Sequence, residues 1–204
     1  MQSVTELTAA QAAESRHSVR RFRPDPVPVA DVREILRLTS LAPSAFNVQP
    51  WRFVVVQDED TKARLRVAAR GQAQVTAAPV VIALYSDMKD ALANLDELVH
   101  PGVPAEQRPA RRQGILNAFA NKSDAEREAW GAAQSGIALG FLLLVAESMG
   151  YATSAMAGFD PAKVKQILDL PEHVAIPALV ALGVADEQGY THHRHDLSRI
   201  ATFR

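Results

Sequence analysis

Two short polar motifs carry side chains that could bind an anion and the edge of an organic ring. The first places three arginines, a histidine and a hydroxyl group between Arg16 and Arg21. Guanidinium groups bind phosphate oxygens through paired hydrogen bonds, and Ser18 could add a bond to the same anion. The motif predicts a phosphate site, and a solvated basic turn is the alternative for such a cluster taken alone.

The second motif is the polar loop 43–50, in which Ser44, Asn47 and Gln49 lie between two prolines. Proline restricts the backbone on both sides and holds the loop out of helix, so that a hydroxyl and two amides project from a fixed frame. The apolar stretch 51–57 follows at once and predicts a strand that anchors the loop in a sheet. Such a loop suits the edge of a heterocycle, although taken alone it is more often a plain connection.

The combination of the two motifs is more specific than either one. The chain contains Arg-His-Ser-x-Arg-x-Phe, about two dozen residues of helical character, and then Pro-Ser-x-x-Asn-x-Gln-Pro-Trp-x-Phe. This arrangement resembles the FMN-dependent nitroreductase family. The resemblance extends along most of the chain and includes Gln72, the apolar helix near Ser135, and segments 156–160 and 179–183. Residues 87–122 look individual to this chain.

The resemblance implies an α+β fold, in which helices flank a central, mostly antiparallel sheet. It implies a single domain over residues 1–204, with 87–122 as a variable lid or excursion. It also implies a homodimer with exchanged C-terminal tails, in which FMN is bound tightly at the subunit interface.

The resemblance also implies a set of FMN contacts. Arg16, His17 and Ser18 are expected at the phosphate and ribityl chain, and Arg20 beside the N1 and O2 edge of the flavin. Loop residues would reach the same flavin across the dimer interface. The other expected contacts are Pro43, Ser44, Asn47, Gln72, Met156, Ala157, Gly158, His192 and Arg194.

The activity implied by the resemblance is a ping-pong oxidoreduction. NADH or NADPH gives hydride to flavin N5 and leaves, and a nitroaromatic, a quinone or a similar organic acceptor then takes its place. Hydride transfer requires no side-chain base, and the sequence contains no recognisable catalytic dyad. No catalytic side chain is therefore expected.

Two departures from the family pattern bear most on the acceptor. Ala45 stands where a second serine is common, and Ala157 stands where many members carry glutamate before Gly-Phe. Flavin contacts at these positions would have to come from the backbone. Two alternatives stay open: a flavoenzyme of the same fold with a specialised reaction such as dehalogenation or dehydrogenation, and a non-enzymatic FMN carrier.

The composition is that of an ordinary globular protein. Of 204 residues, 48% are hydrophobic and 22% charged, with a net charge of −1, which gives no support for nucleic-acid binding. The absence of cysteine excludes thiolate chemistry, so that a redox role must fall to a cofactor. The histidines at 192, 193 and 195 lie on an extended tail and do not predict a metal site.

No membrane association is expected, since the longest apolar run, 136–146, is about half of the ~20 residues that a spanning helix needs. The N-terminus lacks the apolar segment of a signal peptide, so cytoplasmic location is the default.

Apolar periodicity and turn residues predict the order of elements. The helix 123–149 is apolar all round from 135 to 145, so we expect it to be buried on all sides, with Gly136 and Gly140 permitting a dimer contact. The other predicted helices are 8–14, 29–41, 60–70, 91–99 and 160–168, and the predicted strands are 51–57, 79–85, 153–157 and 176–184.

Overall fold

The computed structural model describes residues 7–204 and places a four-stranded sheet at the centre of the protein. The strand order is β1-β2-β4-β3, and each neighbouring pair is antiparallel. The strands are β1 (Trp51–Val56), β2 (Val80–Ser86), β3 (Ala152–Met156) and β4 (Ala175–Gly183). The α+β class with an antiparallel central sheet is confirmed.

The two central strands are buried on both faces because their side chains alternate between two cores. Val81 of β2 and Leu179 of β4 belong to one core. Ile82 and Val180, one residue further along each strand, belong to the other. The strand predicted over 79–85 is confirmed as Val80–Ser86, and it is covered on both faces.

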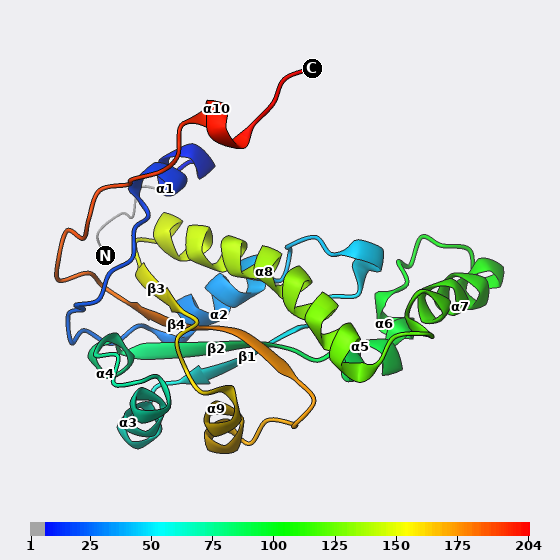
Figure 1. Ribbon diagram of the computed structural model, residues 1–204, viewed down its shortest axis with the longest axis horizontal. Helices are drawn as coiled ribbons and strands as arrows, with labels where there is room; N and C mark the ends of the chain where they lie inside the picture. The colour runs from blue at the N-terminus through cyan, green and yellow to red at the C-terminus, as the bar shows by residue number, and fades with distance from the viewer. Residues whose placement is uncertain (1–6) are drawn as a thin grey trace.

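Helices supply the two covering layers (Figure 1). They are α2 (Val29–Thr39) and α8 (Asp124–Ser148) on one face, and α3 (Glu59–Ala68) and α9 (Pro161–Leu168) on the other. Ile35 of α2 and Leu142 of α8 pack in the core that contains Ile82 and Val180. Leu65 of α3 and Val164 of α9 pack in the core that contains Val81 and Leu179. The shorter elements outside these layers are α1 (Ala9–Ser15), the 3₁₀ turn η1 (Ala45–Asn47), α4 (Gln74–Ala77) and α10 (Leu197–Ile200).

Helix α8 begins as expected but is not buried on all sides. Ser123 caps it with a reciprocal bond from Glu126. Only 28% of its most apolar window of 18 residues is buried within the chain, and Ile137 and Phe141 are exposed. Within the single chain the sheet covers only one face of the helix, and burial of the remaining face against a second copy stays a prediction.

By length and composition alone, α8 is also apolar enough to cross a membrane. The core helix of a soluble protein passes the same test, so that this property does not by itself indicate a membrane segment.

The excursion 88–122 is largely helical, whereas only one helix and a lid had been predicted there. It contains α5 (Met88–Ala93), α6 (Leu95–Leu98), η2 (Ala105–Gln107) and α7 (Arg108–Phe119). Leu95, Ile115 and Phe119 form a small core together with Val48 of the polar loop. The Phe119 ring also meets the Trp130 ring of α8 edge-on, with centroids 4.9 Å apart. The excursion therefore packs against both the loop and α8.

Candidate functional site

The first half of the candidate site is built along strand β3. The backbone N–H of Val19 donates to the Thr153 carbonyl at 3.0 Å, and Ser18 pairs with Thr153 as a parallel bridge. The segment that carries Arg16 and Arg20 therefore runs beside β3. At the other end of this strand, the Gln72 side chain donates from Nε2 to the Gly158 carbonyl at 3.1 Å. One protomer thus brings together the N-terminal motif, Gln72 and the segment 156–158.

Two of the arginines in the N-terminal motif have unpaired guanidinium groups. Among residues 7–204, the side chains of Arg16 and Arg20 make no hydrogen bond or ion pair, whereas Arg21 pairs with Glu187 at 3.2 Å. The Glu187 carboxylate also accepts the backbone N–H groups of Arg20, at 2.6 Å, and Arg21, at 3.2 Å. These bonds hold the pKa of Glu187 below its ordinary value. Sequence reasoning missed Glu187, which lies 166 residues away from the backbone that it fixes.

Beside this segment, the His17 ring has one engaged and one unpartnered nitrogen. Nδ1 lies 2.7 Å from the Ser15 carbonyl and donates to it, while the buried Nε2 has no partner within the described part of the chain. Gly189 packs on the ring at a φ of 69°, and a Cβ there would lie 2.2 Å from the ring carbon Cδ2. A cavity of about 460 Å³ opens here, and His192 contributes to its wall.

Arg194 is not brought to this group of residues. Its guanidinium donates only to the carbonyl of the adjacent His193, at 2.8 Å. The tail beyond Glu187 leaves the body of the molecule and ends with exposed side chains at Tyr190, Ile200 and Phe203 (Figure 1).

The second half of the site is the loop 43–50, which has an uncommon backbone. Phe46 and Asn47 both have φ of 58° and Gln49 has φ of 45°, a left-handed region that is rare for residues other than glycine. A 3₁₀ turn lies inside the loop, so the two prolines do not exclude helical turns entirely. Strained backbone of this kind persists only where surrounding contacts hold it, and it clusters at functional sites.

The contacts that hold the loop come from three parts of the chain. Ser44 Oγ accepts the Gln49 N–H at 2.9 Å. The Ala45 N–H donates to Gln134 of α8 at 2.9 Å. The Asn47 amide donates to the Leu98 carbonyl at 3.1 Å. Contacts within one protomer therefore hold Ser44 and Asn47, two of the predicted site residues. Pro43 is exposed beside them.

The two halves do not meet within one chain. The loop is tied to Gln134 in the N-terminal half of α8, whereas α1 and the segment after it lie near the C-terminal end of that helix (Figure 1). No hydrogen bond or ion pair joins the two halves among residues 7–204. Within the described chain, the loop and the N-terminal motif therefore form two separate half-sites.

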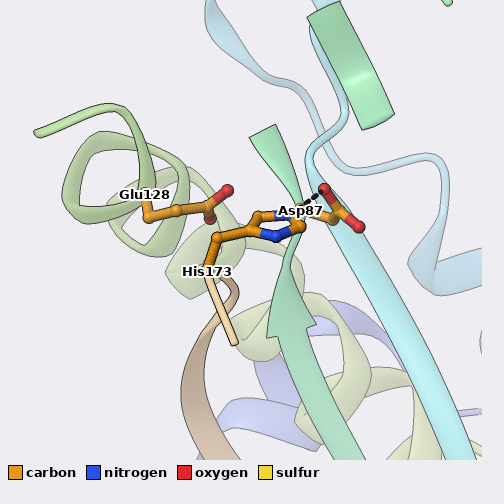
Figure 2. Close-up of side chains that lie close together, drawn as sticks. All are labelled: Asp87, Glu128 and His173. Atoms are coloured by element: carbon orange, nitrogen blue, oxygen red, sulfur yellow. Dashed lines mark hydrogen bonds and ion pairs between the residues drawn. The ribbon is translucent and has the colours of Figure 1, made fainter. Parts of the chain in front are cut away.

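A polar cluster that the sequence did not reveal lies at the root of the excursion (Figure 2). Asp87, Glu128 and His173 come from the end of β2, from α8 and from the turn before β4. His173 Nε2 lies 2.9 Å from Asp87 Oδ1. The Glu128 carboxylate accepts the Ser86 hydroxyl at 2.8 Å and the Met88 N–H, the first of α5, at 2.7 Å.

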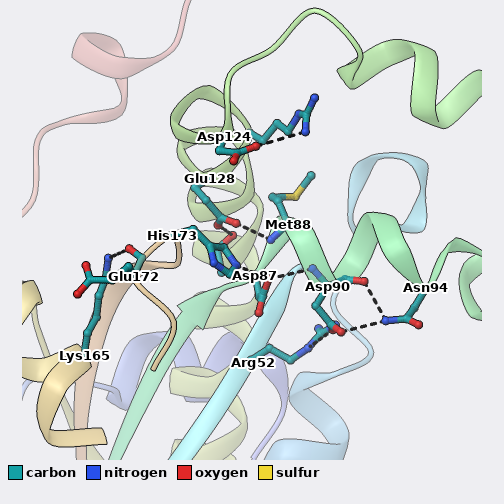
Figure 3. A network of polar contacts seen from close by, with 12 residues as sticks. Arg52, Asp87, Met88, Asp90, Asn94, Asp124, Glu128, Lys165, Glu172 and His173 are labelled. Atoms are coloured by element: carbon teal, nitrogen blue, oxygen red, sulfur yellow. Dashed lines mark hydrogen bonds and ion pairs between the residues drawn. The ribbon is translucent and has the colours of Figure 1, made fainter. Parts of the chain in front are cut away.

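This cluster continues into the polar loop (Figure 3). The Asp87 N–H donates to the Pro50 carbonyl at 2.9 Å, and the Asp87 carboxylate accepts the Asp90 N–H at 2.9 Å. Arg52 forms an ion pair with Asp90 and donates to the Gln49 carbonyl at 3.0 Å. One network therefore supports both the strained loop and the start of the excursion.

With the fold and the site described, comparison with known proteins identifies the family. The family model described as "Nitroreductase family" matches residues 13–184. The chain belongs to the nitroreductase family. This confirms the resemblance found in the sequence and identifies the protein as an oxidoreductase.

Three similar proteins illustrate the relationship. A Thermus thermophilus protein named NADH dehydrogenase is 54% identical over 198 residues, 97% of each chain. A Bacillus subtilis protein named as an NAD(P)H nitroreductase, YdgI, is 30% identical and covers 93% of this chain and 94% of its own. A nitroreductase-type structure from Exiguobacterium sibiricum, solved in complex with FMN, superposes with a TM-score of 0.88 at 27% identity, covering 97% of this chain and 98% of that one.

In this nitroreductase-family chain, the pKa values of the two carboxylates of the cluster are shifted in opposite directions. Burial raises the pKa of Glu128 above its ordinary value and outweighs the bonds from Ser86 and Met88. Burial also acts to raise the pKa of Asp87, but the hydrogen bonds from the Asp90 N–H and His173 more than offset it, so the pKa is lowered. Asp87 thus favours its charged form and Glu128 disfavours it.

The same three residues have ligand atoms within 4.8 Å of one another, a spacing that also occurs in metal sites. Each carboxylate here already accepts hydrogen bonds from the protein, and Lys89 and Arg127 line the adjacent cavity of about 180 Å³. Asp124, which forms an ion pair with Arg127, also lines this cavity. The contacts therefore describe a hydrogen-bonded ionic network that joins three elements.

Substitution of Glu128 tests this network. Glu128→Ala leaves a buried hydroxyl and a helix-start N–H without an acceptor, and we expect a loss of about 2–3 kcal/mol in the free energy of unfolding. Glu128→Gln keeps an acceptor and the volume, so its loss should be smaller. Urea unfolding at fixed protein concentration measures both, and an alanine variant as stable as the wild type would contradict the assignment.

The pH dependence follows from the raised pKa of Glu128. Relative to Glu128→Gln, the wild type should be most stable below about pH 4.5, the ordinary value, and should lose that advantage as the pH rises through the folded-state pKa. Urea unfolding of both proteins between about pH 4 and pH 8 measures the difference. A difference that grows with pH would show that the sign is wrong.

Proposed function

We propose that the protein is a homodimeric FMN-dependent oxidoreductase. It takes hydride from NADH or NADPH and reduces a nitroaromatic, a quinone or a similar organic acceptor in a ping-pong cycle. The observation that carries the proposal is the pair of separated half-sites, one with unpaired guanidinium groups and one with a strained polar loop. The FMN complex of the Exiguobacterium relative and the names of the curated relatives support the choice of cofactor and co-substrate.

The donor set of the first half fits a flavin mononucleotide. Arg16 and Ser18 offer the guanidinium and hydroxyl donors that a phosphate monoester accepts. The unpartnered His17 Nε2 can pair with a ribityl hydroxyl. The Thr153 hydroxyl beside Ser18 is also buried and has no hydrogen-bond partner among residues 7–204. Arg20 places a cation where negative charge develops on the reduced ring, which raises the reduction potential.

The second half reaches the same flavin only from a partner subunit. The open face of α8 offers the surface for that contact, since Ile137 and Phe141 are exposed. Within residues 7–204, a Cβ built at Gly136 or Gly140 would meet no atom within 4 Å beyond its chain neighbours and the nearby backbone of the helix itself. Two such helices can approach closely because the face is apolar and its two glycines occupy little space. A two-fold rotation at this face would bring the loop of one copy toward the N-terminal motif of the other.

When bound, FMN supplies the hydride chemistry, and the chain supplies position and charge. Gln72 and the backbone of Met156–Gly158 form one edge of the pocket, where Ala157 contributes no polar side chain. Pro43, Ser44 and Asn47 of the partner would form the opposite edge. Arg194 and His192 would close over the phosphate only after the partner holds the tail in place, with exchanged tails as part of the dimer.

We place the enzyme in the cytoplasm.

A specialised reaction is the second candidate. A Thermotoga neapolitana relative named iodotyrosine deiodinase is 26% identical over 180 residues, and Ala157 departs from the glutamate of many family members. Rapid oxidation of NADH or NADPH without the special substrate would oppose this alternative.

The deciding experiment is anaerobic reduction of the purified yellow protein. We expect NADH or NADPH to bleach the oxidised flavin band and a quinone to restore it, in two separable half-reactions. Flavin that stays oxidised would favour the carrier or specialised alternatives. A colourless protein that does not take up added FMN would overturn the proposal.

The phosphate role of Arg16 predicts a loss of FMN affinity on truncation. Arg16→Ala removes a charge-assisted bond worth about 1.5–3 kcal/mol, so the Kd for FMN should rise about ten- to a hundredfold. Arg64→Ala, which removes an exposed arginine of α3, is the matched control. Quenching of flavin fluorescence on titration measures both, and equal affinities in the two variants would contradict the role.

The dimer predicts that assembly and FMN retention are lost together. Phe141, which is 38% exposed on α8, becomes buried in the proposed interface, and Phe141→Glu would place an unpaired charge there. Light scattering after gel filtration should show a monomer that has lost its flavin. Val67→Glu, at a position that is 75% exposed on α3, should remain a yellow dimer. A Phe141→Glu dimer with full flavin content would contradict the proposed interface.

A further inference from the structure

A cavity lies between the polar loop and the excursion. Its volume is about 810 Å³, which is within the range of small-molecule sites. Phe46 of the loop forms one wall, and Leu98, Val103 and Ile115 of the excursion supply the apolar surface opposite. A flat organic ring fits such a lining. In the proposed dimer this cavity borders the flavin that the loop contacts, so the inference rests on the proposed function.

One arginine of the excursion lines the cavity with an unpaired guanidinium group. Arg108 donates to the carbonyls of Val103 and Pro101, at 2.9 and 2.8 Å. Arg112 pairs with Asp96 at 3.6 Å. Arg111, between them, makes no hydrogen bond or ion pair within residues 7–204, and it alone of the three belongs to the cavity wall. Its five N–H donors are therefore available to a ligand.

A second donor is set by the tautomer of His100. The Gly102 N–H donates to His100 Nδ1 at 3.0 Å, so the neutral ring carries its hydrogen on Nε2. His100 also lines the cavity. The acidic residue of the wall is Glu106, which forms no ion pair with Arg111. Two donor groups, one of them a guanidinium, face this single carboxylate, and the positive end of the α7 dipole lies beside them.

We propose that this cavity selects aromatic carboxylates as electron acceptors and that Arg111 binds the carboxylate group. The aromatic ring lies against Phe46, and the reducible substituent points toward the flavin of the partner. Guanidinium and carboxylate pair through two parallel charge-assisted hydrogen bonds, which are stronger than the bonds that a neutral group accepts. For a nitro group, the overall reaction is NAD(P)H plus Ar–NO₂ plus H⁺ giving NAD(P)⁺, Ar–NO and water, with one N–O bond broken.

The test compares two acceptors of the same size, 4-nitrobenzoate and 4-nitrobenzyl alcohol, in the holoenzyme. Arg111→Gln should raise KM for the benzoate about ten- to a hundredfold while kcat changes little, because the lost contact holds the substituent remote from the reacting nitro group. KM for the alcohol should not change. Arg112→Gln is the matched control and should leave both values unchanged. Equal effects of Arg111→Gln on the two acceptors would overturn the proposal.

A binding measurement separates this inference from the proposed function. Calorimetric titration of the holoenzyme with benzoate should show binding that is lost in Arg111→Gln and kept in Arg112→Gln, whether or not NADH reduces the protein. Glu106→Gln removes the repelling carboxylate and should tighten benzoate binding. Benzoate binding that is equal in Arg111→Gln and the wild type, or weakened by Glu106→Gln, would overturn the assignment of the cavity even in an active reductase.

Discussion

The packing of α8 is the constraint on which the rest of the structure depends. The helix is apolar around its circumference, but the sheet covers only the side that carries Ala138, Leu142 and Ala146. The apolar area left in water is unfavourable for a lone chain at about 25 cal/mol per Å². Because the two half-sites lie toward different ends of this helix, the contact that would bury the open face would also assemble the cofactor site.

The ionic network at the root of the excursion connects the strained loop 43–50 with the first helix of the excursion. The loop 43–50 holds three non-glycine residues in left-handed backbone, a cost of about 1–3 kcal/mol each that neighbouring contacts must offset. Asp87 contributes to that support through Pro50, and Glu128 fixes the first N–H of α5. The close approach of α8 depends on Gly131, where a Cβ would lie 2.2 Å from the Ser86 hydroxyl. Loop, excursion and α8 therefore form one packed unit.

Local patterns in the sequence predicted most of the fold. The apolar run 79–85 predicted strand β2, because burial on both faces leaves a continuous apolar stretch in the sequence. The start of α8 at Ser123 could also be predicted, because an N-cap has a local sequence pattern. The helix predicted over 60–70 ends at Ala68, because Arg70 and Gly71 just beyond it take positive φ. Contacts between distant residues left no such signature. Glu187 and Glu128 resemble any surface carboxylate in sequence, and only the tertiary structure brings them to the backbone groups that they bind.

In the proposed dimer, the division of the site between subunits separates cofactor binding from acceptor choice. The donors proposed for the FMN phosphate lie on the N-terminal segment, which β3 holds in place. The wall proposed to select the acceptor lies on the excursion, which shares the cavity with Phe46 and Asn47 of the loop. Substitutions in the excursion can change the cavity without altering a phosphate contact. A scaffold of this kind can keep its cofactor contacts while the excursion changes with the acceptor, as loops on rigid scaffolds do.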